Sequence, residues 1–189
     1  MKFPSGSIVG VFGLPCTGKT SVIQTLTQSS REILACISSG DIARRLSTEA
    51  DTQHMAAGNL YPHEDKLRSE IFDLIKKRRA SGAELIFLDG FPRTADQIQW
   101  LMANQLAGTT NEGCIVQVVA FDVVNRALKR MRSDQDTAEA IKKKIHTQSE
   151  EINKMDKLMH EMSIPYYTII NNDLTTAALR LTHLMGLKK

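Results

Sequence analysis

The chain has 189 residues, of which 42% are hydrophobic and 24% are charged, with a formal net charge of +3. These values lie in the ordinary globular range and predict one compact unit with a sizeable core rather than an assembly of modules. The basic residues form no long tract of the kind found in nucleic-acid-binding tails, so we expect no nucleic-acid partner.

The cysteines indicate a reducing compartment. Cys16, Cys36 and Cys114 are widely spaced and form no C-x-x-C pair, which argues against a disulfide framework or a thiolate metal site. The histidines show no ligand spacing, and we expect them to be surface or loosely packed residues. No apolar run approaches the ~20 residues of a membrane span. We therefore expect a cytoplasmic monomer without a membrane partner.

Five apolar runs alternate with helical patterns along the chain. They cover residues 8–12, 33–37, 85–88, 115–121 and 166–170. Near-continuous hydrophobicity is typical of parallel strands that are buried on both faces, and alternation with helices indicates a doubly wound sheet. The sequence therefore predicts an α/β fold with a five-stranded parallel sheet, helices on both faces and a single domain over residues 1–189. A long helix is expected to carry apolar residues from Ile141 to Met162 on one side.

The first apolar run leads into a segment that fits the pattern G-x-x-x-x-G-K-[ST]. Gly13 and Gly18 let the backbone turn tightly, so that successive N–H groups and the start of the next helix point at anionic oxygens. Lys19 adds a mobile positive charge for the β and γ phosphates, and the Thr20 hydroxyl is placed to coordinate Mg²⁺. A plain strand-to-helix turn is the weaker alternative. The expected ATP-binding residues are Gly13, Pro15, Cys16, Thr17, Gly18, Lys19, Thr20 and Ser21.

A second motif, Asp89-Gly-Phe-Pro-Arg93, stands where the third predicted strand ends. Ligand sites in open α/β sheets lie at the carboxyl ends of strands, so these residues should face the loop around Lys19. We expect Asp89 to hold Mg²⁺ through its water shell and Arg93 to grip a phosphate as a rigid fork. The alternatives are a helix cap and a surface arginine. A third motif, after the second strand, places Arg44 one turn into a helix near the same edge.

Together these motifs resemble the adenylate kinase family of nucleoside monophosphate kinases. The resemblance runs in order through residues 13–20, 38–44, 58–62, 89–93, 132–134 and 142–144. It implies the P-loop kinase fold, a helical segment at about 42–75 that covers the monophosphate site, and a minimal lid at about 131–137. The implied reaction is transfer of the γ-phosphoryl group of ATP to a nucleoside monophosphate, with Mg²⁺ as cofactor and AMP as the expected acceptor.

Carried over by position, the resemblance implies an acceptor site with distinct roles for its members. Arg44 and Arg93 would hold the phosphate of the acceptor, and Gln97 would read its base. The whole implied monophosphate site consists of Ser39, Gly40, Arg44, Gly58, Leu60, Gly90, Arg93 and Gln97.

The donor side departs from the family pattern. The resemblance assigns Arg126 and Arg130 to the adenine or γ-phosphate of ATP. Cys16 stands where the family usually has glycine, and Thr20 and Ser21 follow Lys19 where the family has Gly-Thr, so either hydroxyl could serve Mg²⁺. Lys144 stands where a second lid-side arginine is usual. The implied catalytic residues are Lys19, Arg93, Arg132 and Lys144.

Two other functions stay open. A kinase for UMP, CMP or another nucleoside monophosphate would share everything except the base contacts; Gln97 favours adenine because an amide can pair with its donor and acceptor edge. A catalytically weak P-loop ATPase or nucleotide-binding regulator is the second alternative. The presence of both Arg44 and Arg93 argues against it, because hydrolysis needs no second phosphate site.

Overall fold

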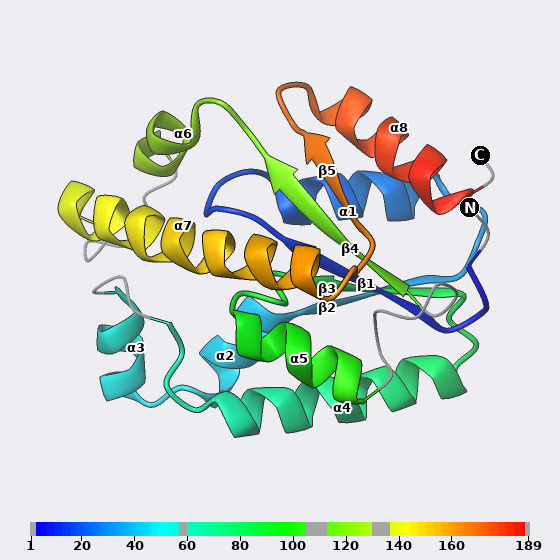
Figure 1. Ribbon diagram of the computed structural model, residues 1–189, viewed down its shortest axis with the longest axis horizontal. Coiled ribbons are helices and arrows are strands. Elements are labelled where there is room, and N and C mark those ends of the chain that lie inside the picture. The colour runs from blue at the N-terminus through cyan, green and yellow to red at the C-terminus, as the bar shows by residue number, and fades with distance from the viewer. Residues whose placement is uncertain (1–2, 57–59, 105–112, 130–136, 188–189) are drawn as a thin grey trace.

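The computed structural model describes residues 3–56, 60–104, 113–129 and 137–187. Within these ranges a five-stranded parallel sheet has the order β2-β3-β1-β4-β5 (Figure 1). The strands are β1 (Ser7–Phe12), β2 (Leu34–Ser38), β3 (Leu85–Asp89), β4 (Gly113–Val119) and β5 (Tyr166–Ile170). The predicted fold class is confirmed.

Helices cover both faces of this sheet (Figure 1). On one face lie α1 (Lys19–Ser29) and α8 (Leu174–Met185), which pack against each other. The opposite face carries α2 (Ser39–Leu46), α4 (Glu64–Ala80), α5 (Ala95–Ala103) and α7 (Ala138–Glu161). Two short helices, α3 (Glu49–Ala56) and α6 (Val123–Lys129), lie toward the carboxyl edge of the sheet. No helix in the described ranges is long and apolar enough to cross a membrane.

The strands are apolar throughout because both of their faces are buried. In β3, Leu85 and Phe87 pack into the core beneath α1 and α8, whereas Ile86 and Leu88 pack against α4 and α5. All four side chains are at most 3% exposed. Full burial of each such side chain contributes about 1.5–3 kcal/mol, so a polar residue on either face would be costly.

Three apolar residues of the predicted strands and the predicted long helix lie outside these elements in the structure. Ile33 precedes β2 and is 59% exposed, and Phe121 follows β4 in a turn and is 82% exposed. Both extend an apolar run beyond the residues that pair in the sheet. Helix α7 buries Ile141, Met155 and Met159, but it ends at Glu161, which leaves Met162 as its exposed C-cap.

The strand register brings three chain segments to one level at the carboxyl edge. Asp89, the last residue of β3, lies opposite Val11 of β1 and Ser38 of β2. The strand order also reverses around β1, with β3 on one side and β4 on the other. A ligand crevice is expected at such a switch point, outside the carboxyl ends of the strands.

Candidate active site

The loop between β1 and α1 has a backbone that requires glycine at two positions. Gly13 has φ 139° and Gly18 has φ 84°, both in the region that favours glycine. A Cβ on Gly13 would lie 2.2 Å from the Val118 carbonyl oxygen, and one on Gly18 would lie 2.3 Å from Asn171 Nδ2. No side chain caps the amino end of α1. Its first N–H groups therefore remain suited to an anion.

Cys16 shares this conformation although it is not glycine. Its φ is 62°, where L residues other than glycine pay a steric cost of roughly 1–2 kcal/mol. This gives a physical reason why the related loops usually carry glycine there. The thiol is half-buried within the loop.

Lys19 folds back over the same loop. Its Nζ donates to the carbonyl oxygens of Gly13, at 2.9 Å, and Leu14, at 2.8 Å, and lies 3.5 Å from Thr17 Oγ1. The first residue of α1 thus places its ammonium group over the turn that precedes the helix. The positive charge and the uncapped helix end lie on one loop.

Thr20 joins this loop to the end of β3. Its hydroxyl donates to Asp89 Oδ2 at 2.5 Å, and Asp89 is only 5% exposed. Thr20 and Ser21 are both exposed, and the hydrogen bond to Asp89 is made by Thr20. Hydroxyl and carboxylate oxygens are hard ligands that suit Mg²⁺. Among the described residues, no group of three or more His, Cys, Asp or Glu side chains could hold a metal ion.

The turn after β3 positions Arg93. Gly90 has φ 73°, its N–H donates to the Val11 carbonyl at 2.9 Å, and its own carbonyl accepts from Ser39 Oγ at 2.7 Å and from Arg93 Nε at 2.7 Å. A Cβ on Gly90 would lie 2.8 Å from Arg93 Nη2. The glycine therefore makes room for the guanidinium group beside β1 and α2.

Arg44 and Arg93 approach the same glycine from different elements. An ideal Cβ on Gly40 would lie 3.4 Å from Arg44 Nη1 and 3.6 Å from Arg93 Nη2. Arg44 forms an ion pair with Asp41 of its own helix. Burial lowers the pKa of Arg93, and the neighbouring Arg44 charge adds to this effect, while Asp89 opposes it. Two guanidinium groups in one place form a site suited to an anion.

Gln97 is buried and both ends of its amide have partners. The Arg93 backbone N–H donates to Gln97 Oε1 at 2.6 Å, and Gln97 Nε2 donates to Glu64 Oε1 at 3.0 Å. Glu64 also accepts from Arg68 Nε at 2.9 Å. Sequence reasoning missed Glu64 as a partner of Gln97. These contacts set the direction of the Gln97 amide.

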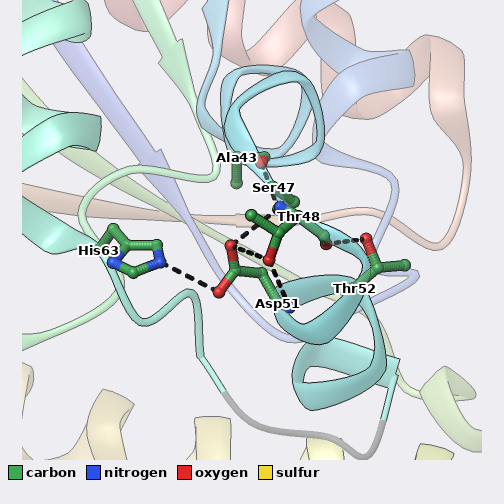
Figure 2. A network of polar contacts seen from close by, with 6 residues as sticks. All are labelled: Ala43, Ser47, Thr48, Asp51, Thr52 and His63. Atoms are coloured by element: carbon green, nitrogen blue, oxygen red, sulfur yellow. Dashed lines mark hydrogen bonds and ion pairs between the residues drawn. The ribbon is translucent and has the colours of Figure 1, made fainter.

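Figure 2 shows the polar contacts that connect α3 with the start of α4. The Asp51 carboxylate accepts from the Thr48 backbone N–H at 2.9 Å, and the Asp51 N–H donates to Thr48 Oγ1 at 3.2 Å, a reciprocal cap on α3. Asp51 Oδ1 lies 3.0 Å from His63 Nε2. His63 was expected to be a surface or loosely packed residue; its side chain is 41% exposed, and it is the N-cap residue of α4 with its ring in edge-on contact with Tyr61. Gly58 lies outside the described residues, and Leu60 is half-buried.

The donor-side basic residues are only partly described. Arg130 and Arg132 lie outside the described residues, as does the proposed lid except for Thr137, the N-cap of α7. Arg126 is half-buried on α6 and Lys144 is half-buried in the second turn of α7. These helices pack against each other near the carboxyl edge of the sheet (Figure 1).

Asn171 is a site residue that sequence reasoning missed. It follows β5 directly, is 5% exposed, and its Nδ2 donates to the Thr17 carbonyl at 2.7 Å. The available signal was its position, a polar residue at the carboxyl end of a predicted strand.

Comparisons with known proteins place the chain in a family. Residues 12–162 match a family model described as an AAA domain. The adenylate kinase of Corynebacterium glutamicum (strain R) is 34% identical over 145 residues, which cover 71% of this chain and 76% of that protein. That of Mycobacteroides abscessus is 30% identical over 151 residues, or 76% and 80%. The chain belongs to the adenylate kinase family. The match to the Helicobacter pylori (strain ATCC 700392 / 26695) adenylate kinase, at 25% identity, spans 62% of that relative's length.

The Asp51 contacts predict a pH-dependent contribution to stability. The Thr48 backbone hydrogen bond, together with the Thr48 hydroxyl and His63, lowers the pKa of Asp51 below its ordinary value of 3.8. The contribution is therefore fully present above pH 3.8 and is lost as pH falls through the lower folded pKa. Asp51→Asn should lower the urea midpoint at pH 7, and the difference from the parent should shrink toward pH 3.

Urea titrations followed by circular dichroism at both pH values measure this effect. Asp73→Asn is the matched control, because Asp73 is exposed on α4 and its carboxylate lies 3.8 Å from the Lys76 ammonium group, also exposed. A difference that stays constant with pH would show that the Asp51 charge contributes nothing.

Proposed function

We propose that this chain catalyses reversible transfer of the γ-phosphoryl group of ATP to a nucleoside monophosphate, with AMP as the preferred acceptor and two ADP as products. One observation supports it above all others. The guanidinium groups of Arg44 and Arg93 flank Gly40 beside Asp89, which is itself bonded to Thr20 of the phosphate loop. A second anion site next to the first suits a kinase whose acceptor is a phosphate.

The phosphate loop would hold the donor. Its N–H groups at the start of α1 would face the phosphates, and Lys19 would exchange its bonds to Gly13 and Leu14 for charge-assisted bonds to phosphate oxygens. Mg²⁺ would be held by the Thr20 hydroxyl and, through water, by Asp89, with the remaining ligands from nucleotide and solvent. When bound, it would neutralise charge on the β and γ phosphates.

The acceptor needs no catalytic base. The second pKa of a phosphate monoester is about 6, so its oxygens are largely anionic at neutral pH and are already nucleophilic. Arg44 and Arg93 would bind that phosphate and place it against the donor, with Ser39, Gly40 and Gly90 shaping the pocket around them. Phosphoryl transfer depends mainly on such positioning and on charge stabilisation.

Gln97 supports adenine as the acceptor base. Gln97 Oε1 accepts from the Arg93 N–H and keeps one lone pair, whereas Nε2 lies 3.0 and 3.1 Å from the two Glu64 oxygens and would give up one of these contacts to donate to a base. That pattern of one acceptor and one donor complements the N6 and N1 edge of adenine. Gly58 and Leu60 would line the base and sugar.

The remaining assignments complete the proposal. Residues 1–189 would act as one kinase domain, with an acceptor-covering segment at about 42–75 and a short lid at about 131–137. Within the segment, the Arg45–Glu70 ion pair of 2.7 Å joins α2 to α4. Arg126 and Arg130 would contact the donor, and Arg132 and Lys144 would approach the transferring group.

The test is an acceptor panel. The protein is incubated with ATP and Mg²⁺ alone and with AMP, CMP, UMP or GMP, and all nucleotides are resolved by ion-exchange chromatography. We expect AMP-dependent formation of ADP at the highest rate. A preference for CMP or UMP would establish the alternative monophosphate kinase, and ADP release that no acceptor increases would establish the weak ATPase or regulator.

Lys19→Ala should lower turnover by at least ~100-fold, because it removes a preorganised charge from the phosphates. Steady-state rates with saturating ATP and AMP measure it, and Lys143→Ala, an exposed lysine on α7, is the control. Near-normal turnover in a folded Lys19→Ala protein would remove the loop from the mechanism.

Arg44→Ala and Arg93→Ala should each lower kcat/KM for AMP by roughly 10² while ATP affinity changes little, since charge-assisted arginine contacts to phosphate are strong. Arg45→Ala is a matched control on the same helix; Arg44 and Arg45 are equally exposed, at 57%. Weakened ATP binding with unchanged AMP kinetics would show that the two sites are assigned the wrong way round.

Gln97→Ala should reduce the preference for AMP over CMP and UMP by about tenfold or more, because it removes an amide contact of ~1–3 kcal/mol that the wrong base leaves unsatisfied. Ratios of kcat/KM measure the effect. An unchanged ratio would assign base selection to other residues.

A further inference from the structure

We propose that Asn171 is a positioning residue that sets the donor affinity of the phosphate loop by fixing the peptide bond between Thr17 and Gly18. This proposal rests on the proposed function only in that the loop binds the phosphates of ATP. Asn171 lies 154 residues from Thr17 in the sequence, and its Nδ2 donates to the Thr17 carbonyl oxygen at 2.7 Å.

The direction of one N–H group follows from this hydrogen bond. In a trans peptide the C=O and N–H bonds point in opposite directions. Because the Thr17 carbonyl faces Asn171, the Gly18 N–H points away from Asn171. Gly18 is the N-cap of α1, so its N–H is the first in the series that continues with Lys19 and Thr20 at the amino end of that helix.

Without Asn171, the plane of this trans peptide unit can rotate by about half a turn at small cost. Glycine adopts positive and negative φ about equally well, so a peptide unit next to Gly18 can turn over at small cost. The reversed unit would present the Thr17 carbonyl oxygen where an anion is to bind. The hydrogen bond from Asn171 stabilises the orientation in which an N–H donor faces the anion instead.

The packing around this contact is tight. Asn171 is 5% exposed, and a Cβ on Gly18 would lie 2.3 Å from its Nδ2, so neither position has room for a larger side chain. Removal of the amide would leave the Thr17 carbonyl without this donor. The backbone of Asn171 is held independently of its side chain, since its N–H donates to the Val119 carbonyl at 2.8 Å. Substitutions at 171 should therefore preserve the end of β5.

The experiment compares Asn171→Ala and Asn171→Asp with the parent protein. The aspartate is nearly isosteric, but its oxygen cannot donate and would repel the Thr17 carbonyl. Calorimetry gives the dissociation constants for MgATP, inorganic tripolyphosphate and AMP, and melting temperatures report folding. Asn172→Ala is the control, because Asn172 is the next residue in the chain and its Oδ1 accepts from the Phe121 N–H at 3.4 Å, away from the loop between β1 and α1.

We expect Asn171→Ala to weaken MgATP and tripolyphosphate binding about tenfold, the value of one good hydrogen bond, and Asn171→Asp to weaken it further, with AMP affinity unchanged. Asn172→Ala should stay within twofold. The proposal would be overturned by a folded Asn171→Ala protein that binds MgATP and tripolyphosphate like the parent. It would also be overturned by an equal loss of affinity for ATP and AMP together with a lower melting temperature. If the alanine variant does not fold, the aspartate variant decides by the same criteria. Failure of the parent to bind tripolyphosphate and ATP would instead overturn the proposed function.

Discussion

Parallel pairing of β1, β2 and β3 is the constraint on which the site depends. Its register holds Asp89 level with Val11 and Ser38, so three connections leave the sheet side by side. The first becomes the phosphate loop, the second begins α2 with Arg44, and the third turns through Gly90 to Arg93. The pairing is held by a core buried on both faces, and a shift of one residue would separate Thr20 from Asp89 and turn every side chain of the strand toward the opposite face.

The cations of the site have internal partners that a phosphate can replace. Lys19 donates to two loop carbonyls, Arg93 donates to the Gly90 carbonyl, and Arg44 pairs with Asp41, which is exposed. These contacts hold the side chains near the place where an anion would bind. For Lys19 and Arg93, exchange toward a bound anion is favourable because a neutral carbonyl is a weaker partner than a phosphate oxygen.

The acceptor side depends on contacts between helices that are distant from one another in the chain. Glu64, at the start of α4, binds Gln97 of α5, while His63 in the preceding position binds Asp51 of α3. The entry to α4 therefore connects the buried amide next to Arg93 with the capped end of the short helix. The structure joins the expected base-reading residue to the segment at about 42–75 through two adjacent side chains.

The sequence alone determined the elements whose signals are local. Five apolar runs predict the strands, and the glycine and lysine spacing predicts the phosphate loop. The ends of β2 and β4 were displaced because exposed Ile33 and Phe121 extend the apolar runs. Tertiary structure alone decided which polar side chains meet. No spacing in the chain could show that Asn171 reaches Thr17, because such contacts depend on strand order and register, and these are set by the packing of the whole sheet.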